Sequence, residues 1–461
     1  MSASLALARN ASARSIAVIG GGASGALVAA HLIKACGDDV RLTLIEPRAQ
    51  IGRGLAYATE NESHRLNVRA SNMSAFPDDP DHFWRWLRAG GHAGDDRFCF
   101  VPRLVYGRYL ASLIEDRLTE TDAPRLRWLR RTVAGLTECD GSVTVRFSSR
   151  ETAAFDIAIL CCGHEPSEHL AAPFVGPWKD PRAWNDAPDS TILILGTGLT
   201  MVDAAISLSE SGHRGPIMAL SRRGLLPHAH RRIETAPIQE TELPSSAKLG
   251  AFLRWLRARA RNETRRGGDW RTVIDGLRPH TQAIWRAMPS ESRKRFLEHA
   301  RPWWDIHRHR MAPEVEEKIR ALRESGQLQV LSGRLLEVNR QRSGASVRIR
   351  PRGSATTSEL EVSHIISCRG MTSDPRKSAN PLVAQLLAEG YARVDPLGIG
   401  LDVDNDCALI DASGRASNRV FAAGPMSQAA FWEVIAVPDI RLQAALLARR
   451  LAEDAPTPQH V

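Results

Sequence analysis

The sequence predicts an α/β protein with two Rossmann-like dinucleotide-binding domains and a helical insert. Two short apolar runs, at 16–19 and 191–195, predict the pair of domains, because each leads into a glycine-rich turn that continues as a helical pattern. The helical periodicity of an Arg- and Trp-rich stretch from about 240 to 324 predicts the insert. A chain of 461 residues is also too long for a single hydrophobic core.

The first glycine-rich turn carries Gly20, Gly22 and Gly25 at the three glycine positions of a dinucleotide fingerprint. Gly20 allows the tight turn, Gly22 lets backbone N–H groups approach a pyrophosphate, and Gly25 lets the helix pack on the strand. The phosphates then lie at the positive end of the following helix, beside Ser24.

Two further features support this first nucleotide site. A second apolar strand at 41–45 ends in Glu46, about 20 residues after the last glycine, where a carboxylate binds a ribose hydroxyl. A second glycine-rich loop then carries Arg53 and Gly54 and is placed to run beside the same dinucleotide. The alternative is a glycine-rich turn with a surface glutamate, which the second strand disfavours.

The second glycine-rich turn follows the strand at 191–195, and Met201 replaces its third glycine. Its companion strand at 217–220 ends without an acid and is followed by Arg222 and Arg223. Arginines pair with a 2′-phosphate, which an acid would repel, so this site favours NADPH over NADH. Solvated surface arginines are the alternative. The residues that we expect to bind this cofactor are Gly196, Gly198, Thr200, Asp203, Arg222 and Arg223.

The order of the strands predicts a first domain that is interrupted by the second. A Pro-rich connection at 166–188 marks the crossing, and a late strand that ends at Gly424 is expected to return to the first domain. In FAD-binding folds the loop after that strand touches the sugar chain of the flavin, so Gly424 joins Gly163 as an expected cofactor contact. The predicted domains are 1–165 (FAD, first part), 185–365 (NAD(P)H, with the insert at about 240–324) and 366–461 (FAD, second part).

Composition excludes some classes of protein and leaves others open. No apolar run approaches the ~20 residues that cross a bilayer, so we expect no membrane partner. Seven cysteines without metal-ligand or CxxC spacing indicate a reducing cytoplasm and no metal site. The vicinal pair Cys161 and Cys162 ends an apolar strand, so we interpret it as buried and inert, which disfavours a disulfide reductase.

The net charge of +9 comes mainly from arginine and does not by itself identify a partner. The basic helix pattern at 254–261, with aromatic neighbours, is compatible with nucleic-acid binding. Tryptophans that pack the insert while the arginines face water are the more common arrangement, so nucleic acid is disfavoured. The His- and Arg-rich segment 307–310 has no carboxylate partners for a metal site, and we interpret it as anion-facing or structural.

Together these segments resemble a bacterial family of two-dinucleotide FAD/NAD(P)-binding flavoproteins that includes FAD-dependent urate hydroxylase and aspartate N-monooxygenase. The resemblance extends over nearly the whole chain. It is carried by residues 20–25, 52–57, 66–68, 73–80, 102–103, 106–110, 163–164, 196–203, 221–224, 307–313 and 432–441.

The resemblance implies FAD, NADH or NADPH, molecular oxygen and a small anionic substrate. Its first implication is an NAD(P)H-dependent monooxygenase that converts urate to 5-hydroxyisourate by way of a flavin C4a-hydroperoxide. The alternatives are N-hydroxylation of an amino acid such as aspartate, and a non-catalytic flavin redox sensor. Asn67, also expected at the flavin, joins Arg103 and Trp432 as the residues expected to line the substrate cleft. No catalytic residue and no oligomeric state are predicted.

Overall fold

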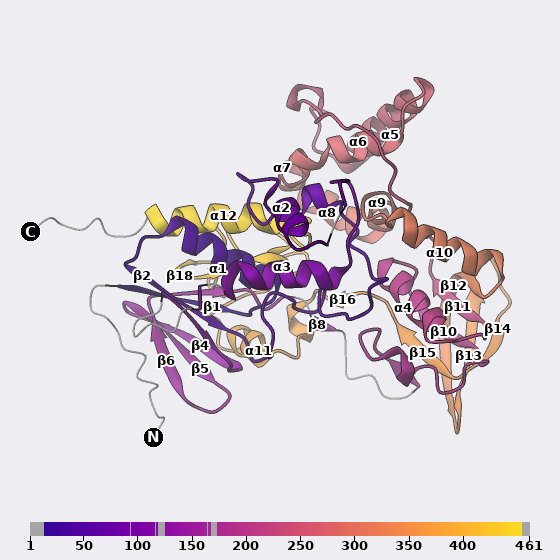
Figure 1. Ribbon diagram of the computed structural model, residues 1–461, viewed down its shortest axis with the longest axis horizontal. Coiled ribbons are helices and arrows are strands. Elements are labelled where there is room, and N and C mark those ends of the chain that lie inside the picture. The colour runs from indigo at the N-terminus through magenta and orange to yellow at the C-terminus, as the bar shows by residue number, and fades with distance from the viewer. Residues whose placement is uncertain are drawn as a thin grey trace, which may run out of the picture. The chain divides into compact units, whose positions relative to one another are not determined.

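The computed structural model describes residues 13–92, 94–115, 117–118, 125–163, 165–166 and 173–453 (Figure 1). The chain forms two compact units. The first contains Met1–Glu60, Arg69–Glu165 and Thr372–Val461, and the second contains Asn61–Val68 and Pro166–Met371. The C-terminal residues therefore belong with the N-terminal ones, and the short segment 61–68 groups with the second unit.

The first unit is built on a six-stranded sheet in the order β17-β18-β7-β1-β2-β3. The four apolar residues at the end of β1 are at most 3% exposed, because parallel neighbours lie on both sides. The late strand β18 pairs in parallel with β7, as the sequence predicts. The strands are β1 (Arg14–Ile19), β2 (Val40–Ile45), β3 (Leu126–Leu129), β7 (Ile157–Leu160), β17 (Ala408–Ile410) and β18 (Ala416–Ala422).

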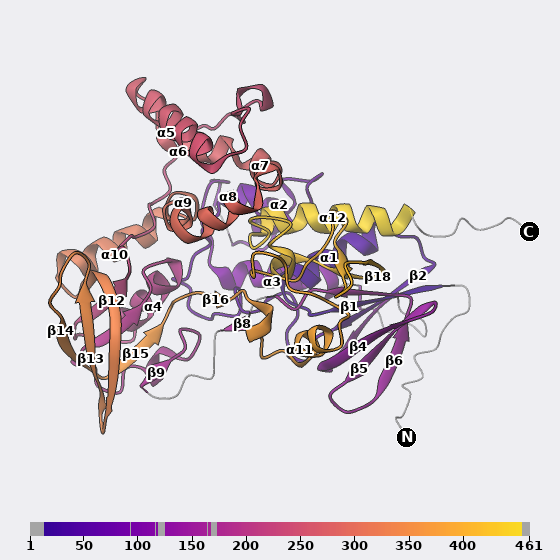
Figure 2. The same cartoon turned by 180° about the vertical axis from the view of Figure 1, so that it is seen from behind.

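Helices cover one face of this sheet and a small antiparallel sheet covers the other, in both views (Figures 1 and 2). Helix α1 lies between α3 and α12. The small antiparallel sheet, in the order β4-β5-β6, lies in the chain between β3 and the return to the parallel sheet at β7. These elements are α1 (Ala23–Ala35), α2 (His82–Ala89), α3 (Arg103–Glu115), α11 (Pro381–Ala388), α12 (Val437–Glu453), β4 (Val133–Cys139), β5 (Ser142–Phe147) and β6 (Thr152–Phe155).

The second unit is built on a seven-stranded sheet in the order β14-β13-β12-β11-β10-β15-β9. Strands β11 and β15 flank β10 in parallel, whereas β13 is antiparallel to both of its neighbours, β12 and β14. Helix α4 (Leu199–Glu210) follows β10 directly. The strands are β9 (Phe174–Val175), β10 (Ile192–Leu195), β11 (Ile217–Ser221), β12 (Leu328–Gln341), β13 (Gly344–Pro351), β14 (Ser358–Val362) and β15 (His364–Ser367).

The insert of the second unit is helical, as predicted. Two of its tryptophans form part of its core, since Trp285 and Trp304 both contact the ring of Phe296 and are at most 9% exposed, whereas Trp303 is 48% exposed. The helices are α5 (Leu249–Arg265), α6 (Trp270–Gly276), α7 (Thr281–Ala287), α8 (Ser290–Arg295), α9 (Arg301–Arg308) and α10 (Pro313–Glu324), with a π-helical turn at Phe296–Ala300. None of the helices in the described ranges combines the length and apolarity that a bilayer span requires.

Candidate functional site

The first glycine-rich turn is pressed against the end of β7, which explains two of its glycines. Gly20 has φ +102°, and a Cβ there would lie 2.5 Å from the carbonyl oxygen of Cys161. A Cβ at Gly25 would meet the carbonyl oxygen of Gly20 well inside the 3.0 Å that real Cβ atoms keep. The turn therefore requires glycine at both positions for steric reasons that lie within the protein itself.

The second glycine-rich loop runs beside the first, as expected. The Gly52 N–H donates a 2.8 Å hydrogen bond to the carbonyl oxygen of Gly21. A Cβ at Gly22 would lie 3.2 Å from the Cα of Gly54. Gly22 is the N-cap of α1, where no side chain caps the helix and no acidic residue stands in the first turn. Two glycine-rich loops thus meet at the N-terminus of a helix, an arrangement that fits the pyrophosphate of a dinucleotide.

Glu46 lies next to this turn, 2% exposed, at the end of β2. Its Oε2 accepts hydrogen bonds from the Gly21 N–H (2.9 Å) and Arg48 Nη2 (3.0 Å), and its Oε1 accepts from Arg48 N (3.0 Å) and Nε (2.8 Å). Burial favours the neutral acid, but the bonds from Arg48 and Gly21 outweigh it and lower the pKa of Glu46. Its role as a ribose ligand stays a prediction, and a ribose hydroxyl would share or replace a bond from Arg48.

Ser24 and Gly424, both predicted at the cofactor, lie together in the structure. Gly424 has φ +74°, and a Cβ there would overlap the Oγ of Ser24. Its N–H donates to Gln443 Oε1 (2.7 Å), and Gln443 Nε2 donates to Ser427 Oγ (2.9 Å). These bonds attach the segment after β18 to α12. Sequence reasoning missed Gln443, because its partners are distant along the chain.

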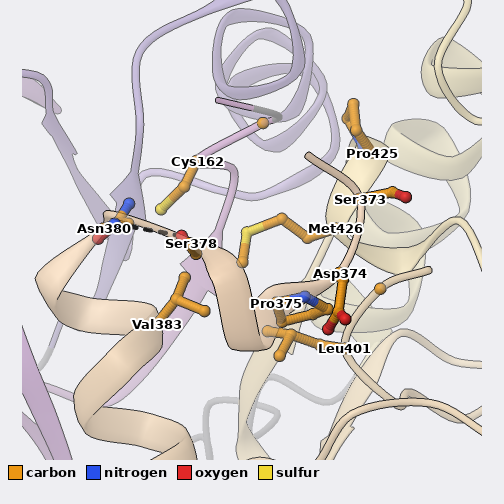
Figure 3. A pocket seen from close by; sticks show the side chains of 12 residues that line it. Cys162, Ser373, Asp374, Pro375, Ser378, Asn380, Val383, Leu401, Pro425 and Met426 are labelled. Carbon is orange, nitrogen blue, oxygen red and sulfur yellow. Dashed lines mark hydrogen bonds between the residues drawn. The ribbon is translucent and has the colours of Figure 1, made fainter. Parts of the chain in front are cut away.

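A cleft of about 410 Å³, open to solvent, lies at the carboxyl ends of β7 and β18 (Figure 3). Carboxyl ends of parallel strands are the usual ligand-binding edge of such sheets. Gly163 lines the cleft, whereas its neighbour His164 lies outside the described residues. The other lining residues are Cys162, Ser373, Asp374, Pro375, Ser378, Asn380, Val383, Gly400, Leu401, Pro425 and Met426.

Sequence reasoning also missed the polar residues of this cleft, although a local signal marks them. Asp374 and Asn380 each precede a proline and accept a backbone N–H two residues further on, at 3.1 and 3.0 Å. An Asp or Asn followed by proline is a typical helix start. The motif identifies two helix N-termini, but only the fold brings both to the end of β7.

The residues predicted to line the substrate cleft lie in different units. Arg103 begins α3 and Trp432 is 4% exposed, both in the first unit. Asn67 belongs to the second unit, where its carbonyl oxygen lies 3.0 Å from Nε2 of His230. Arg53 packs along α3, where its Cγ would lie 3.1 Å from a Cβ at Gly107. A cleft formed by these residues stays a prediction.

The second glycine-rich turn repeats the geometry of the first. Gly196 has φ +108°, and a Cβ there would overlap the carbonyl oxygen of Cys368 on the neighbouring strand. Gly198 is the N-cap of α4, and a Cβ there would meet no described atom within 4 Å, so its face is open. The Thr197 hydroxyl donates to Ser221 Oγ (2.9 Å), which ties the turn to the end of β11. This open helix N-terminus fits a second pyrophosphate.

The predicted arginines stand directly after that end of β11. Arg222 is exposed, and within the described part of the chain it makes no hydrogen bond or ion pair. Arg223 is half-buried and makes one long contact, 3.5 Å from Nη2 to the carbonyl oxygen of His299. In α4, Thr200 is half-buried and Asp203 is 9% exposed. The end of β11 therefore offers a free guanidinium beside the second turn.

Within the described ranges the structure shows neither a disulfide nor a cluster of metal-binding side chains. All seven cysteines are free, and burial raises the pKa of Cys161 well above its usual value. Cys162 lies 3.6 Å from the carbonyl oxygen of Ile19. No group of three or more His, Cys, Asp or Glu side chains among the described residues is arranged to hold a metal ion.

Two sheets, each with a glycine-rich turn between a buried parallel strand and a helix, give this chain the fold of two-dinucleotide FAD/NAD(P)-binding proteins. Comparison with known proteins agrees. Residues 17–165 match a protein family described as FAD-NAD(P)-binding, so the first unit contains a domain of this type. A search of curated protein sequences finds no match.

Solved structures with the same fold include monooxygenases and reductases. Ornithine N-hydroxylase from Kutzneria sp. 744, described with reduced FAD, NADP+ and L-ornithine, has a TM-score of 0.64 at 13% identity and covers 96% of this chain and 99% of its own. L-lysine 6-monooxygenase from Pseudomonas syringae has a TM-score of 0.65 at 16% identity, with the same coverage. Bacillithiol disulfide reductase from Staphylococcus aureus has a TM-score of 0.55 at 10% identity, again with 96% and 99% coverage.

These findings confirm the predicted fold class and the FAD and NAD(P) cofactors, and they agree with the prediction of an enzyme. The expected urate activity has no counterpart among these structures.

Proposed function

We propose that this protein is an FAD-dependent NAD(P)H monooxygenase that hydroxylates the amino group of a small amino acid. The observation that carries the proposal is the higher similarity to the ornithine and lysine monooxygenases (TM-scores of 0.64 and 0.65) than to the disulfide reductase (0.55) at the same coverage. A fold at such low identity does not by itself identify a substrate, so the site must supply further support.

The cysteines favour a monooxygenase over a reductase. Thiol–disulfide exchange requires an accessible thiol that ionises readily. The vicinal pair here has one thiol, Cys161, that is 3% exposed with a pKa raised by burial. A buried neutral thiol is a poor nucleophile, so this pair is not suited to thiol–disulfide exchange.

The two glycine-rich turns would hold the two cofactors. Gly22 and Gly54 offer backbone approach to the FAD pyrophosphate, and Gly198 does so for NAD(P)H. When bound, the flavin takes a hydride from the nicotinamide and supplies the oxygen-activating chemistry. The chain's own contribution is to bind and orient both nucleotides and to keep water from the reacting groups.

We propose small amino acids as the substrate class. This follows the N-hydroxylation alternative, with the substrate widened from aspartate to small amino acids in general. The similarity to ornithine and lysine monooxygenases supports it, whereas no comparison supports urate. Arg103 of α3, predicted to line the substrate cleft, is the partner that we propose for a substrate carboxylate, since a guanidinium binds carboxylate in a bidentate manner.

The test is NADPH or NADH oxidation and oxygen uptake by the FAD-loaded full chain with aspartate, ornithine, lysine or urate. We expect an amino acid to stimulate both rates and to give a hydroxylamine product, detected by mass as a gain of one oxygen atom. Stimulation by urate alone, with loss of urate absorbance, would overturn the proposal. NADPH-dependent reduction of a small disulfide without oxygen uptake would assign a reductase instead.

A further inference from the structure

Helix α5 of the insert carries a row of unpaired positive charge. Exposed arginines recur along it every three or four residues, and a helix that turns by about 100° per residue places them on an arc of about 80°. Within the described part of the chain none of them makes a hydrogen bond or an ion pair. The residues of this arginine stripe are Arg254, Arg257, Arg261 and Arg265.

The acidic residue of α5 does not neutralise the stripe. Glu263 is the one acid of this helix, and the same helical period places it on the opposite side. Arg259 lies outside the stripe and pairs with Glu242 at 2.8 Å, so an arginine of α5 does pair where an acid is within reach. Like charges three or four residues apart repel one another and destabilise a helix. An external anion along the stripe would remove this repulsion.

The side of α5 opposite the stripe packs against the rest of the insert. Phe252 is 5% exposed, and its ring stacks on that of Trp255 at a centroid separation of 5.8 Å. Helix α5 contacts α6 and α8, and both views show it beside α6, at the end of the insert that lies far from the sheet of the second unit (Figures 1 and 2). A helix that binds a membrane surface needs an apolar side that is free to enter the lipid. The packing of Phe252 leaves α5 the charged side as its free side, which disfavours a membrane.

The length and the chemistry of the stripe fit a row of phosphates. The helix rises by about 16 Å from Arg254 to Arg265. One strand of a nucleic-acid duplex carries a phosphate about every 3.4 Å along the axis, so roughly five phosphates lie within this length. A guanidinium binds phosphate oxygens in a bidentate manner and is more weakly hydrated than an ammonium group. Each arginine of the stripe can therefore contact a different phosphate.

We propose that the arginine stripe of α5 binds the phosphate backbone of a nucleic-acid duplex. Contacts to phosphates position a protein on a duplex without reading its sequence, so this binding is independent of sequence. The sequence alone favours arginines that only face water. The structure adds that four of them are aligned on one side of a helix, with no acid among them. The proposal uses neither glycine-rich turn, so it stands or fails independently of the proposed N-hydroxylation.

Fluorescence anisotropy of short labelled duplexes, titrated with the FAD-loaded full chain, tests this surface. Neutralisation of four phosphates predicts that the logarithm of the binding constant falls with the logarithm of salt concentration with a slope of about −3.6. The affinity should then fall roughly 100-fold between about 50 and 200 mM salt. Two DNA duplexes of unrelated sequence should bind equally well. An RNA duplex beside them shows which of the two nucleic acids binds more tightly.

A double variant assigns the binding to the stripe. Arg257→Gln with Arg261→Gln removes the two central charges, so we expect a slope of about −1.8 and at least tenfold weaker binding at low salt. The matched control is Arg340→Gln with Arg342→Gln, which removes two exposed arginines of the second unit that also lack ion pairs within the described ranges. This control should bind as the wild type does. Urea unfolding and flavin absorbance verify that both double variants fold and retain FAD.

Four results would overturn the proposal. The first is equal loss of binding in the two double variants, which would assign the effect to net charge. The second is displacement of the duplex by saturating NADP+, which would place the phosphates at the second glycine-rich turn. The third is retention on vesicles of phosphatidylcholine and phosphatidylserine under conditions in which no duplex binds, which would assign the stripe to a membrane. The fourth is a wild-type protein that binds neither DNA nor RNA at low salt.

Discussion

Replacing Gly25 with alanine tests the packing of the first glycine-rich turn most directly. A Cβ at this position would meet the carbonyl oxygen of Gly20 so closely that the start of α1 or the turn must move by about 1 Å. Overpacking of this kind costs about 1–3 kcal/mol. Alanine also gains roughly 1 kcal/mol of helix propensity, so we expect a net loss of up to about 2 kcal/mol in the free energy of unfolding.

The displacement matters more for FAD than for folding. A shift of this size removes at least one backbone N–H from the pyrophosphate, and a hydrogen bond to a charged group contributes about 1.5–3 kcal/mol. We therefore expect FAD affinity to fall roughly 10- to 100-fold. The measurements are urea unfolding and titration of the apoprotein with FAD, followed by quenching of flavin fluorescence.

The matched control for this substitution is Gly94→Ala. A Cβ at Gly94 meets no described atom within 4 Å, and its φ is not positive, so we expect neither stability nor FAD affinity to change. If Gly25→Ala behaved as this control does, the steric argument would be wrong. If Gly25→Ala lost stability but kept its FAD affinity, the turn would not hold the pyrophosphate.

Three further predictions concern other parts of the chain. Arg222→Ala should raise the KM for NADPH about tenfold and leave that for NADH unchanged, because the exposed guanidinium is the expected partner of the 2′-phosphate; an equal change for both cofactors would contradict this role. Thr197→Val should lower the free energy of unfolding by about 1 kcal/mol, since it removes the hydroxyl that bonds to Ser221 Oγ and to the part-buried carbonyl oxygen of Leu225, and urea unfolding measures the loss. Burial lowers the pKa of His31, so the folded protein favours the neutral ring, and this stabilisation is lost as the pH falls below the unfolded pKa of about 6.5. The denaturant midpoint of unfolding should therefore fall less between pH 7 and 5.5 in His31→Gln than in the wild type. Parallel pH curves for the two proteins would refute this assignment.

Much of the fold could be predicted because its signals are local. The turn at Gly20 and the turn at Gly196 each follow a buried strand, and a backbone with φ above +100° needs glycine whatever surrounds it. The parallel return of β18 beside β7 follows from the general order of strands in such folds. The helical insert is likewise visible as periodicity.

The site could be predicted less completely, since its remaining contacts join distant segments. The sequence identifies Glu46, but only the structure shows that Arg48 and Gly21 already occupy its oxygens. Nothing in the local pattern places Asp374 and Asn380 at the end of β7, and nothing places Gln443 beside Gly424. Such contacts depend on how whole elements pack.

The sequence by itself determined two nucleotide-binding turns, their strands and helices, and the return of the C-terminal segment to the first sheet. The turns, strands and helices depend on backbone geometry or on hydrophobic periodicity within a few neighbouring residues, whereas the return of the C-terminal segment follows from the general order of strands in such folds. Only the tertiary structure decided that Arg271, Arg308 and Arg310 of the insert are buried. In the sequence these arginines look like solvated charges, because burial is a property of the packed elements around a side chain and not of the residue itself.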